Sequence, residues 1–294
     1  MVCVDSSVKT FVLRDYDLGA TLISGQAFRW RRQDESWVGI IGDRWVRLRS
    51  TDSSLTAETA EPVEDWSWLT HYLQLDLDLN GILKTFPTDP PMQAAVAACR
   101  GLRLLRQDPW ECLASFILSS TKQILQIQQI ISLLCHKYGA PASVPPGHLP
   151  AYAFPTAERL AELSEAQLRA CKMGFRAPFL LAAARSIAHS KLDLRAVQDL
   201  PLEAARNELL KLHGVGRKIA DCVLLFAFGH QTAFPVDVWI MKVLRHFYFP
   251  HRKVSLRQLQ EFAGSHFGRH AGYAQQYLFH YARSQMKRGE LPTL

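Results

Sequence analysis

A glycine-rich break between two amphipathic helical segments places the strongest constraint on the fold of this chain. The segment LEAARNELLKLHGVGRKIADCVLLFAFG predicts a helix to about Leu212, a tight turn over Gly214–Gly216 and a second helix to about Phe228. Because glycine accepts positive φ, the turn can be short and its N–H groups can point outward together. The sequence therefore predicts a helix-hairpin-helix with an anion site where the second helix begins.

The charge balance of the chain fits an anionic partner at this turn. Its 294 residues include 34 lysines and arginines against 27 acidic residues, a formal net charge of +7. This excess favours nucleic acid, a membrane surface or an acidic substrate without separating them. A phosphate bound by the backbone would be held regardless of base sequence, as in docking on a duplex. A simple packing corner, in which the glycines only allow two helices to approach, remains the alternative.

Lys218 occupies an unfavourable position for a positive charge. It falls in the first turn of the second predicted helix, where the helix dipole and the free N–H groups disfavour the charged form of the amine. A neutral amine is a nucleophile, whereas an ammonium group is not. The position therefore predicts a reactive lysine, with a solvated, phosphate-attracting lysine as the alternative.

A carboxylate follows at the start of another predicted helix. In AFPVDVWIMKVL, Asp237 comes after Pro235 and Val236, a favoured N-cap position. Capping alone accounts for an aspartate here. Both roles can coexist, because a carboxylate fixed by capping can also stabilise a cationic transition state beside Lys218 if the two helix starts converge.

The composition changes from strand-like to helix-like along the chain. FRWRRQDESWVGIIGDRWVRLR, residues 28–49, predicts three strands of an antiparallel meander, and from about residue 64 helical spacing dominates. We predict an α+β fold with a small antiparallel sheet domain, residues 1–88, followed by a mostly helical domain, residues 89–294. Predicted helix starts within the second domain include Asp108, Ser164 and Ser255.

Several other classes of protein do not fit the sequence. The six cysteines lie far apart without metal-ligand spacing, and none follows Cys222, which argues against a C-terminal four-cysteine cluster. The histidines form no HExxH motif. No segment approaches the roughly 18 apolar residues of a membrane span. We therefore expect reduced thiols, no catalytic metal and no membrane association.

The motifs together resemble the helix-hairpin-helix DNA glycosylases with a Gly/Pro-rich loop and catalytic aspartate (HhH-GPD), and most closely the 8-oxoguanine DNA glycosylase/AP lyase family. The likeness covers SGQAFRW, LRLLRQDPWECLASFILSS, GFRAPFLLAAAR, LHGVGRKIADC, PVDVW and AGYAQQYLF. It implies a TBP-like sheet domain and an HhH-GPD domain with its hairpin at 212–218 and its aspartate loop at 234–239. It also implies a monomer, needing no cofactor, that acts on duplex DNA containing 8-oxoguanine. Such a protein would be DNA-associated in a prokaryotic cytoplasm, or nuclear in a eukaryote.

The resemblance assigns chemistry to the two helix starts. Lys218 matches the lysine that attacks C1′ of the damaged nucleotide, expels the base and forms a Schiff base, after which β-elimination nicks the strand. Asp237 matches the aspartate that assists this nucleophile and stabilises positive charge on the sugar. The target nucleotide must leave the stack, because C1′ is not reachable in a closed duplex.

The resemblance also assigns a base pocket. Gly25 matches the glycine whose carbonyl accepts the N7 proton that 8-oxoguanine has and guanine lacks. Cys222 and Phe279 match the residues that sandwich the flipped purine, and Gln275 matches the one that meets its Watson–Crick edge. Without the resemblance, ordinary helix packing explains the last three residues equally well.

Contacts with the DNA backbone are implied at the hairpin. The N–H groups of Gly214, Gly216 and Ile219 would bind phosphate. A structural cation, which takes no part in the chemistry, could bridge the hairpin to a phosphate through the backbone carbonyls of Leu210, Leu212 and Val215.

This chain departs from the animal members of the family around the orphaned base. Thr121 stands where they carry the asparagine that fills the space left by the flipped base, and Gln126 replaces an arginine that reads the opposite cytosine. Phe175, as an aromatic wedge, and Arg176 are retained in kind. Trp239 replaces a phosphate-contacting histidine.

Two other readings remain open from the residues alone. One is a glycosylase of the same superfamily that acts on another damaged base. The other is a non-catalytic DNA-binding module, since such hairpins occur in many repair and replication proteins.

The change at Gln126 predicts relaxed discrimination of the base opposite the lesion. Loss of a charged donor removes a contact specific to cytosine. Excision rates measured with 8-oxoguanine placed opposite each of the four bases should therefore be similar. A strong preference for cytosine would contradict this prediction.

Overall fold

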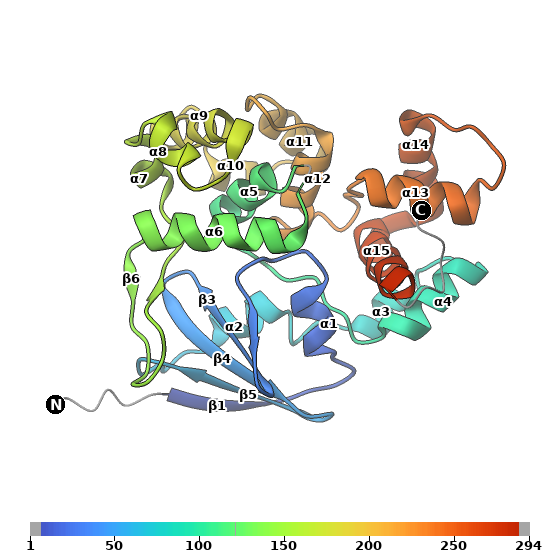
Figure 1. The fold of residues 1–294 in the computed structure, drawn as a ribbon. Helices are drawn as coiled ribbons and strands as arrows, with labels where there is room; N and C mark the ends of the chain where they lie inside the picture. Colours follow the sequence, from blue (N-terminus) through green and yellow to red (C-terminus); the bar gives the residue numbers. More distant parts are fainter. Residues whose placement is uncertain (1–6, 121, 288–294) are drawn as a thin grey trace.

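A computed structural model describes residues 7–120 and 122–287, and its N-terminal part is the expected antiparallel sheet (Figure 1). The strand order is β1-β5-β4-β3-β2. The meander predicted over residues 28–49 is confirmed as β2, β3 and β4, whereas β1 and β5 were not anticipated. The strands are β1 (Ser7–Val12), β2 (Arg31–Gln33), β3 (Ser36–Ile41), β4 (Arg44–Ser50) and β5 (Ser54–Thr59).

Two helices bury the inner face of this sheet. They are α1 (Leu18–Ile23) and α2 (Ser67–Leu73). Leu22 of α1 and Leu69 of α2 join Leu48 and Leu55 of the sheet in one apolar cluster. The segment Ser24–Gln26 directly follows α1, so the packing of this helix fixes where that loop leaves the sheet domain.

The described chain beyond the sheet domain is mostly helical, which confirms the predicted α+β class. A two-stranded ribbon, β6 (Pro141–Ala142) with β7 (Ala151–Tyr152), interrupts the helices. The helices are α3 (Leu79–Leu83), α4 (Pro90–Cys99), α5 (Pro109–Leu118), α6 (Ile124–Tyr138), α7 (Ala157–Ala161), α8 (Glu165–Arg169), η1 (Gly174–Arg176), α9 (Ala177–Ala188), α10 (Leu194–Gln198), α11 (Leu202–Leu210), α12 (Arg217–Phe226), α13 (Val238–Tyr248), α14 (Leu256–His266), η2 (Gly268–His270) and α15 (Ala271–Lys287).

The predicted helix starts are confirmed at three positions. Asp108 caps α5 through the N–H of Glu111, and Ser164 and Ser255 form capping boxes with glutamines three residues later. None of the helices within 7–120 and 122–287 has both the length and the apolar character to cross a membrane.

The two apolar cores do not divide cleanly at one point in the sequence. Phe28 precedes the second strand yet belongs to the helical core, whereas Leu105 lies beyond α4 yet belongs to the sheet core. The domain boundary at residue 88 stays a prediction.

Helix α12 is the buried centre of the helical part. From Ile219 to Phe226 every residue is buried. Asp221 on this helix accepts a hydrogen bond from Arg206 of α11 at 2.6 Å, and the two side chains are 3% and 4% exposed. On another side, a Cβ added to Gly272 of α15 would lie 2.2 Å from Leu225. The position of α12 is therefore set by a buried ion pair and by a close helix contact.

The Arg206–Asp221 pair predicts a large stability effect. Arg206→Met would leave the Asp221 carboxylate buried without its main partner, which costs about 3–5 kcal/mol in the free energy of unfolding. Chemical denaturation followed by circular dichroism measures this change. The control is Arg257→Met, which breaks the exposed Arg257–Glu261 pair and should cost less than about 1 kcal/mol. Equal small losses in both variants would contradict the role assigned to the buried pair.

Candidate active site

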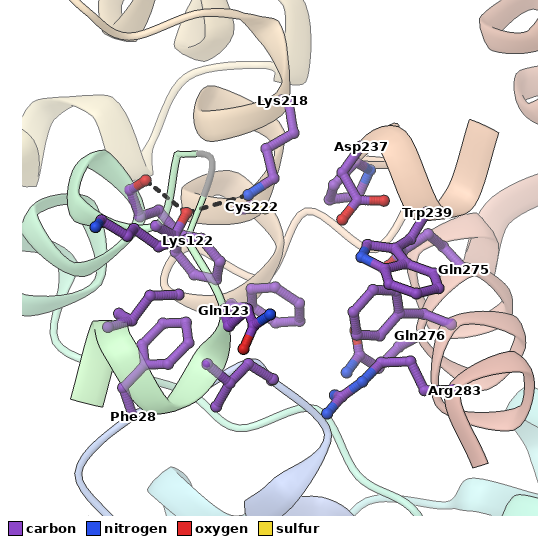
Figure 2. Close-up of a pocket in the computed structure, with 18 of the residues that line it drawn as sticks. Phe28, Lys122, Gln123, Lys218, Cys222, Asp237, Trp239, Gln275, Gln276 and Arg283 are labelled. Atoms are coloured by element: carbon purple, nitrogen blue, oxygen red, sulfur yellow. Dashed lines mark hydrogen bonds between the residues drawn. The ribbon is translucent and has the colours of Figure 1, made fainter. Parts of the chain in front are cut away.

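A single cavity of about 420 Å³ collects all six predicted catalytic and base-binding residues (Figure 2). Its walls come from the loop after α1, from α5 and α6, and from the starts of α12 and α13 and one face of α15. The predicted site residues that line it are Gly25, Lys218, Cys222, Asp237, Trp239, Gln275 and Phe279. Sequence reasoning missed other lining residues, among them Phe28, Phe116, Ser119, Lys122, Ile124, Gln276 and Arg283.

The Lys218 amine is held at the cavity wall by α5. Its Nζ donates to Ser119 Oγ at 3.3 Å, and Ser119 Oγ donates in turn to the Phe116 carbonyl at 2.7 Å. The amine also lies 5.1 Å from the centre of the Phe116 ring. Lys218 is therefore half-buried and directed, which differs from the freely solvated alternative. Ser119 lies within the FILSS motif, but nothing local in the sequence indicated that it would meet a lysine 99 residues away.

Asp237 is both a helix cap and a wall of the cavity. Its Oδ1 accepts the N–H of Ile240 at 2.7 Å, so the capping role is confirmed. Figure 2 shows its carboxylate and the Lys218 amine directed into the same cavity from the starts of α13 and α12. A half-buried carboxylate fixed in this way can place negative charge where a cation develops.

Cys222 lies one turn beyond Lys218 on α12 and is buried. Burial raises the pKa of its thiol to about 12, against the opposing effect of the Lys218 charge. The group is therefore a neutral thiol near neutral pH, and it presents an apolar, polarisable surface to the cavity.

The loop that carries Gly25 is fixed from both ends of the chain. The Nε2 of Gln276, on α15, donates to the Ser24 carbonyl at 3.0 Å. Gln26 is fully buried and donates through Nε2 to the carbonyls of Thr21 and Arg103. Gly25 itself has φ +87°, a conformation that favours glycine. The backbone at Gly25 is thus a rigid part of the cavity wall.

Gln275 and Phe279 lie on the α15 face that lines the cavity. The two residues are four positions apart and therefore share this face. Gln275 is 5% exposed, and its Oε1 has no hydrogen-bond partner within the described part of the chain. A buried acceptor without a partner is costly, so the cavity is suited to a ligand that supplies a donor.

The hairpin has the predicted helix–turn–helix geometry. Gly214 has φ +85°, and a Cβ there would lie 2.4 Å from the Phe179 ring. The N–H groups of Gly214, Gly216 and Ile219 donate to no backbone carbonyl among residues 7–120 and 122–287, and Ile219 lies in the first turn of α12 with its side chain buried. The free N–H groups at the start of a helix can bind an anion.

The three carbonyls expected at a cation differ in their bonding. The Leu212 carbonyl accepts the N–H of Val215 at 3.1 Å. In the described chain the Leu210 and Val215 carbonyls accept no backbone N–H outside regular helix bonds. Oxygen atoms of this kind fit a hard cation.

The residues predicted to meet the rest of the DNA differ in exposure. Phe175 and Trp239 are exposed, at 52% and 40%. Gln126 is exposed too, but its Oε1 accepts the Gln123 N–H and so belongs to the start of α6. Thr121 lies outside the described residues.

Arg176 was expected at the DNA surface, yet the structure buries it. It is 2% exposed and donates to the carbonyls of Ser120 and Met173. In this conformation its guanidinium supports the turn that follows α5, next to Ser119. The carbonyl of Ser120 attracts it inward, which the sequence could not indicate because the partners lie 56 residues apart.

Comparison with known proteins accounts for nearly the whole chain. Residues 10–113 match the family model "8-oxoguanine DNA glycosylase, N-terminal domain". Residues 114–265 match the model "HhH-GPD superfamily base excision DNA repair protein".

Individual relatives agree with these models. A probable N-glycosylase/DNA lyase of Methanothermobacter thermautotrophicus is 35% identical over 68% of this chain and 69% of its own. N-glycosylase/DNA lyase OGG1 of Arabidopsis thaliana is 28% identical over 89% of this chain and 76% of its own.

A solved structure shows the same architecture. The 8-oxoguanine glycosylase/lyase of Clostridium acetobutylicum, in complex with double-stranded DNA containing cytosine opposite 8-oxoG, superposes with a TM-score of 0.88. It is 32% identical, and the match covers 95% of this chain and 98% of that one. The chain therefore belongs to the HhH-GPD superfamily of base excision DNA repair proteins, and within it to the 8-oxoguanine DNA glycosylase/lyase family.

Proposed function

We propose that this protein removes 8-oxoguanine from duplex DNA and then nicks the strand, with Lys218 as the nucleophile. The observation that carries the proposal is that one cavity holds the Lys218 amine, the Asp237 carboxylate and the fixed backbone of Gly25. Names of relatives that describe N-glycosylase/DNA lyases support the same reaction. The cavity volume is in the range of small-molecule sites and suits a single everted base.

The chemistry follows from the two helix starts. The electron pair of neutral Lys218 forms a bond to C1′, while the bond from C1′ to the base breaks and its electron pair leaves with the base, which takes up a proton. The fixed charge of Asp237 stabilises the sugar as it becomes cationic. The C1′–O4′ bond then breaks as the nitrogen electron pair forms the C=N bond of a Schiff base, and O4′ takes up a proton from the nitrogen. Loss of a C2′ proton from the Schiff base then expels the 3′-phosphate.

Recognition of the lesion is assigned to the Gly25 carbonyl. It would accept the N7–H of 8-oxoguanine, whereas guanine would place its N7 acceptor against the carbonyl and leave both unpaired. The Cys222 thiol and the Phe279 ring would lie on opposite faces of the purine. The free Oε1 of Gln275 would accept a donor from the Watson–Crick edge.

Docking on the duplex is assigned to the hairpin. The N–H groups of Gly214 and Gly216 would bind a phosphate, and Ile219 would contribute at the start of α12. A cation at the Leu210, Leu212 and Val215 carbonyls would add positive charge there. Phe175 would act as a wedge in the stack, and we propose that the protein acts as a monomer.

A covalent DNA adduct tests the nucleophile. Borohydride reduction should trap the protein on a duplex containing 8-oxoguanine, and Lys218→Gln should abolish the adduct because it removes the Nζ that bonds to C1′. The control is Lys191→Gln, an exposed lysine in the turn after α9, which should keep the adduct. Full trapping by Lys218→Gln would refute the assigned role. If the wild-type protein were trapped on duplexes containing thymine glycol or 3-methyladenine and not on 8-oxoguanine, the reaction would stand but the assigned substrate would be wrong.

Asp237→Asn separates the charge of this residue from its capping role. Asparagine is also a good N-cap, so α13 should begin normally and the melting temperature should stay close to that of the wild type. Loss of the fixed charge should slow single-turnover base excision by about 100-fold or more. An unchanged excision rate would remove the electrostatic role of this carboxylate and leave the capping role.

A further inference from the structure

An arginine that sequence reasoning left aside lies in the base cavity with one donor unpaired within the described residues. Arg283 extends from α15 into the cavity, below Gln276 in Figure 2. Its Nη1 is buried and has no hydrogen-bond partner within residues 7–120 and 122–287. Burial lowers the pKa of Arg283, and the Asp237 charge opposes this effect. A desolvated donor of this kind is costly to the free protein, and a ligand that supplies an acceptor relieves the cost.

The guanidinium is adjacent to the backbone that meets the base. A Cβ built on Gly25 would lie 3.4 Å from Arg283 Nη1 and 3.4 Å from Phe279 Cε1. The guanidinium also lies 5.4 Å from the centre of the Phe279 ring, a cation–π contact that limits its movement. Arg283 therefore lies next to the backbone of Gly25 in the cavity wall.

The spacing on α15 decides which end of a purine Arg283 reaches. Gln275 and Arg283 both line the cavity and lie eight residues apart, or about 12 Å along the helix axis. They therefore approach a bound purine from opposite ends. With Gln275 at the Watson–Crick edge, Arg283 reaches the edge of the five-membered ring, where 8-oxoguanine carries O8 beside N7–H.

We propose that Arg283 is a specificity-determining residue that donates a hydrogen bond to O8 of the everted lesion. This inference rests on the proposed function and extends it. The Gly25 carbonyl accepts the N7 proton and the Arg283 guanidinium donates to the neighbouring oxygen. The two contacts together read both atoms that oxidation changes. Guanine offers neither, since it has a hydrogen at C8 and an acceptor at N7.

Two other roles for Arg283 predict a different dependence on the substrate. An arginine that steadied Asp237 or bound a DNA phosphate would act on any substrate, including one without a base. An arginine that read O6 would act equally on guanine and 8-oxoguanine, because both carry O6. Substrates that differ in these features therefore separate the three roles.

Binding measured without chemistry gives the first test. In the Lys218→Gln background, the dissociation constants for duplexes containing 8-oxoguanine and guanine at the same position should differ strongly. Adding Arg283→Leu should reduce that ratio by about tenfold, the loss of one charge-assisted hydrogen bond. A ratio that stays the same, with both duplexes weakened equally, would overturn the assignment to O8.

Reaction at a preformed abasic site gives the second test. Arg283→Leu in the otherwise native protein should keep wild-type borohydride trapping on abasic DNA, while its single-turnover excision of 8-oxoguanine falls by about tenfold or more. Arg283→Lys, which keeps one donor, should recover part of the excision rate. Equal losses on abasic and 8-oxoguanine DNA would show a phosphate or structural role and overturn the inference.

The matched control is Lys122→Leu, which removes one positive charge from another wall of the same cavity. This variant should weaken binding of the 8-oxoguanine duplex and of the guanine duplex by the same factor, and it should lower the salt dependence of binding. A wild-type protein without activity on 8-oxoguanine would sink the proposed function itself. Normal wild-type activity with an unaltered Arg283→Leu variant would sink only the role of the arginine.

Discussion

The buried ion pair between Arg206 and Asp221 holds the element on which the whole site depends. Helix α12 has almost no exposed surface after its first turn, so it cannot shift without disturbing the helical core. One face of it lines the cavity, and its first turn carries the amine. A nucleophile on a loop could adopt many orientations in solvent. One on an anchored helix is already held in one orientation before the substrate binds.

The remaining groups of the cavity are brought to this amine by segments distant in the sequence. Ser119 comes from the end of α5, Asp237 from the cap of α13, and Gly25 from a loop of the sheet domain. Each is held by its own backbone or side-chain hydrogen bonds rather than by the others. Two buried groups of the cavity, Gln275 Oε1 and Arg283 Nη1, have no hydrogen-bond partner within the described residues, as expected for a site that a ligand completes.

The sequence predicted features that depend on residues close together in the chain, and it missed those that depend on residues far apart. The hairpin, the caps at Asp108, Ser164 and Ser255, and the β2–β4 meander follow from patterns within a few residues, and all are confirmed. Strands β1 and β5 pair across more than forty residues, and no local pattern indicated that pairing. Ser119 and Arg283 were missed for the same reason. Arg176 was predicted to face DNA because its motif was similar, but the Ser120 carbonyl turns it inward.

The glutamines around Gly25 link chemical discrimination to the completeness of the fold. Gln276 comes from the final helix, and Gln26 ties the loop to the segment at Arg103, so the direction of the Gly25 carbonyl depends on contacts from distant parts of the chain. The Lys218 amine is directed by contacts of its own, from α12 and from Ser119 at the end of α5. A change that loosens α15 would therefore release the loop at Ser24, and with it the fixed carbonyl by which an oxidised base would be distinguished from an intact one.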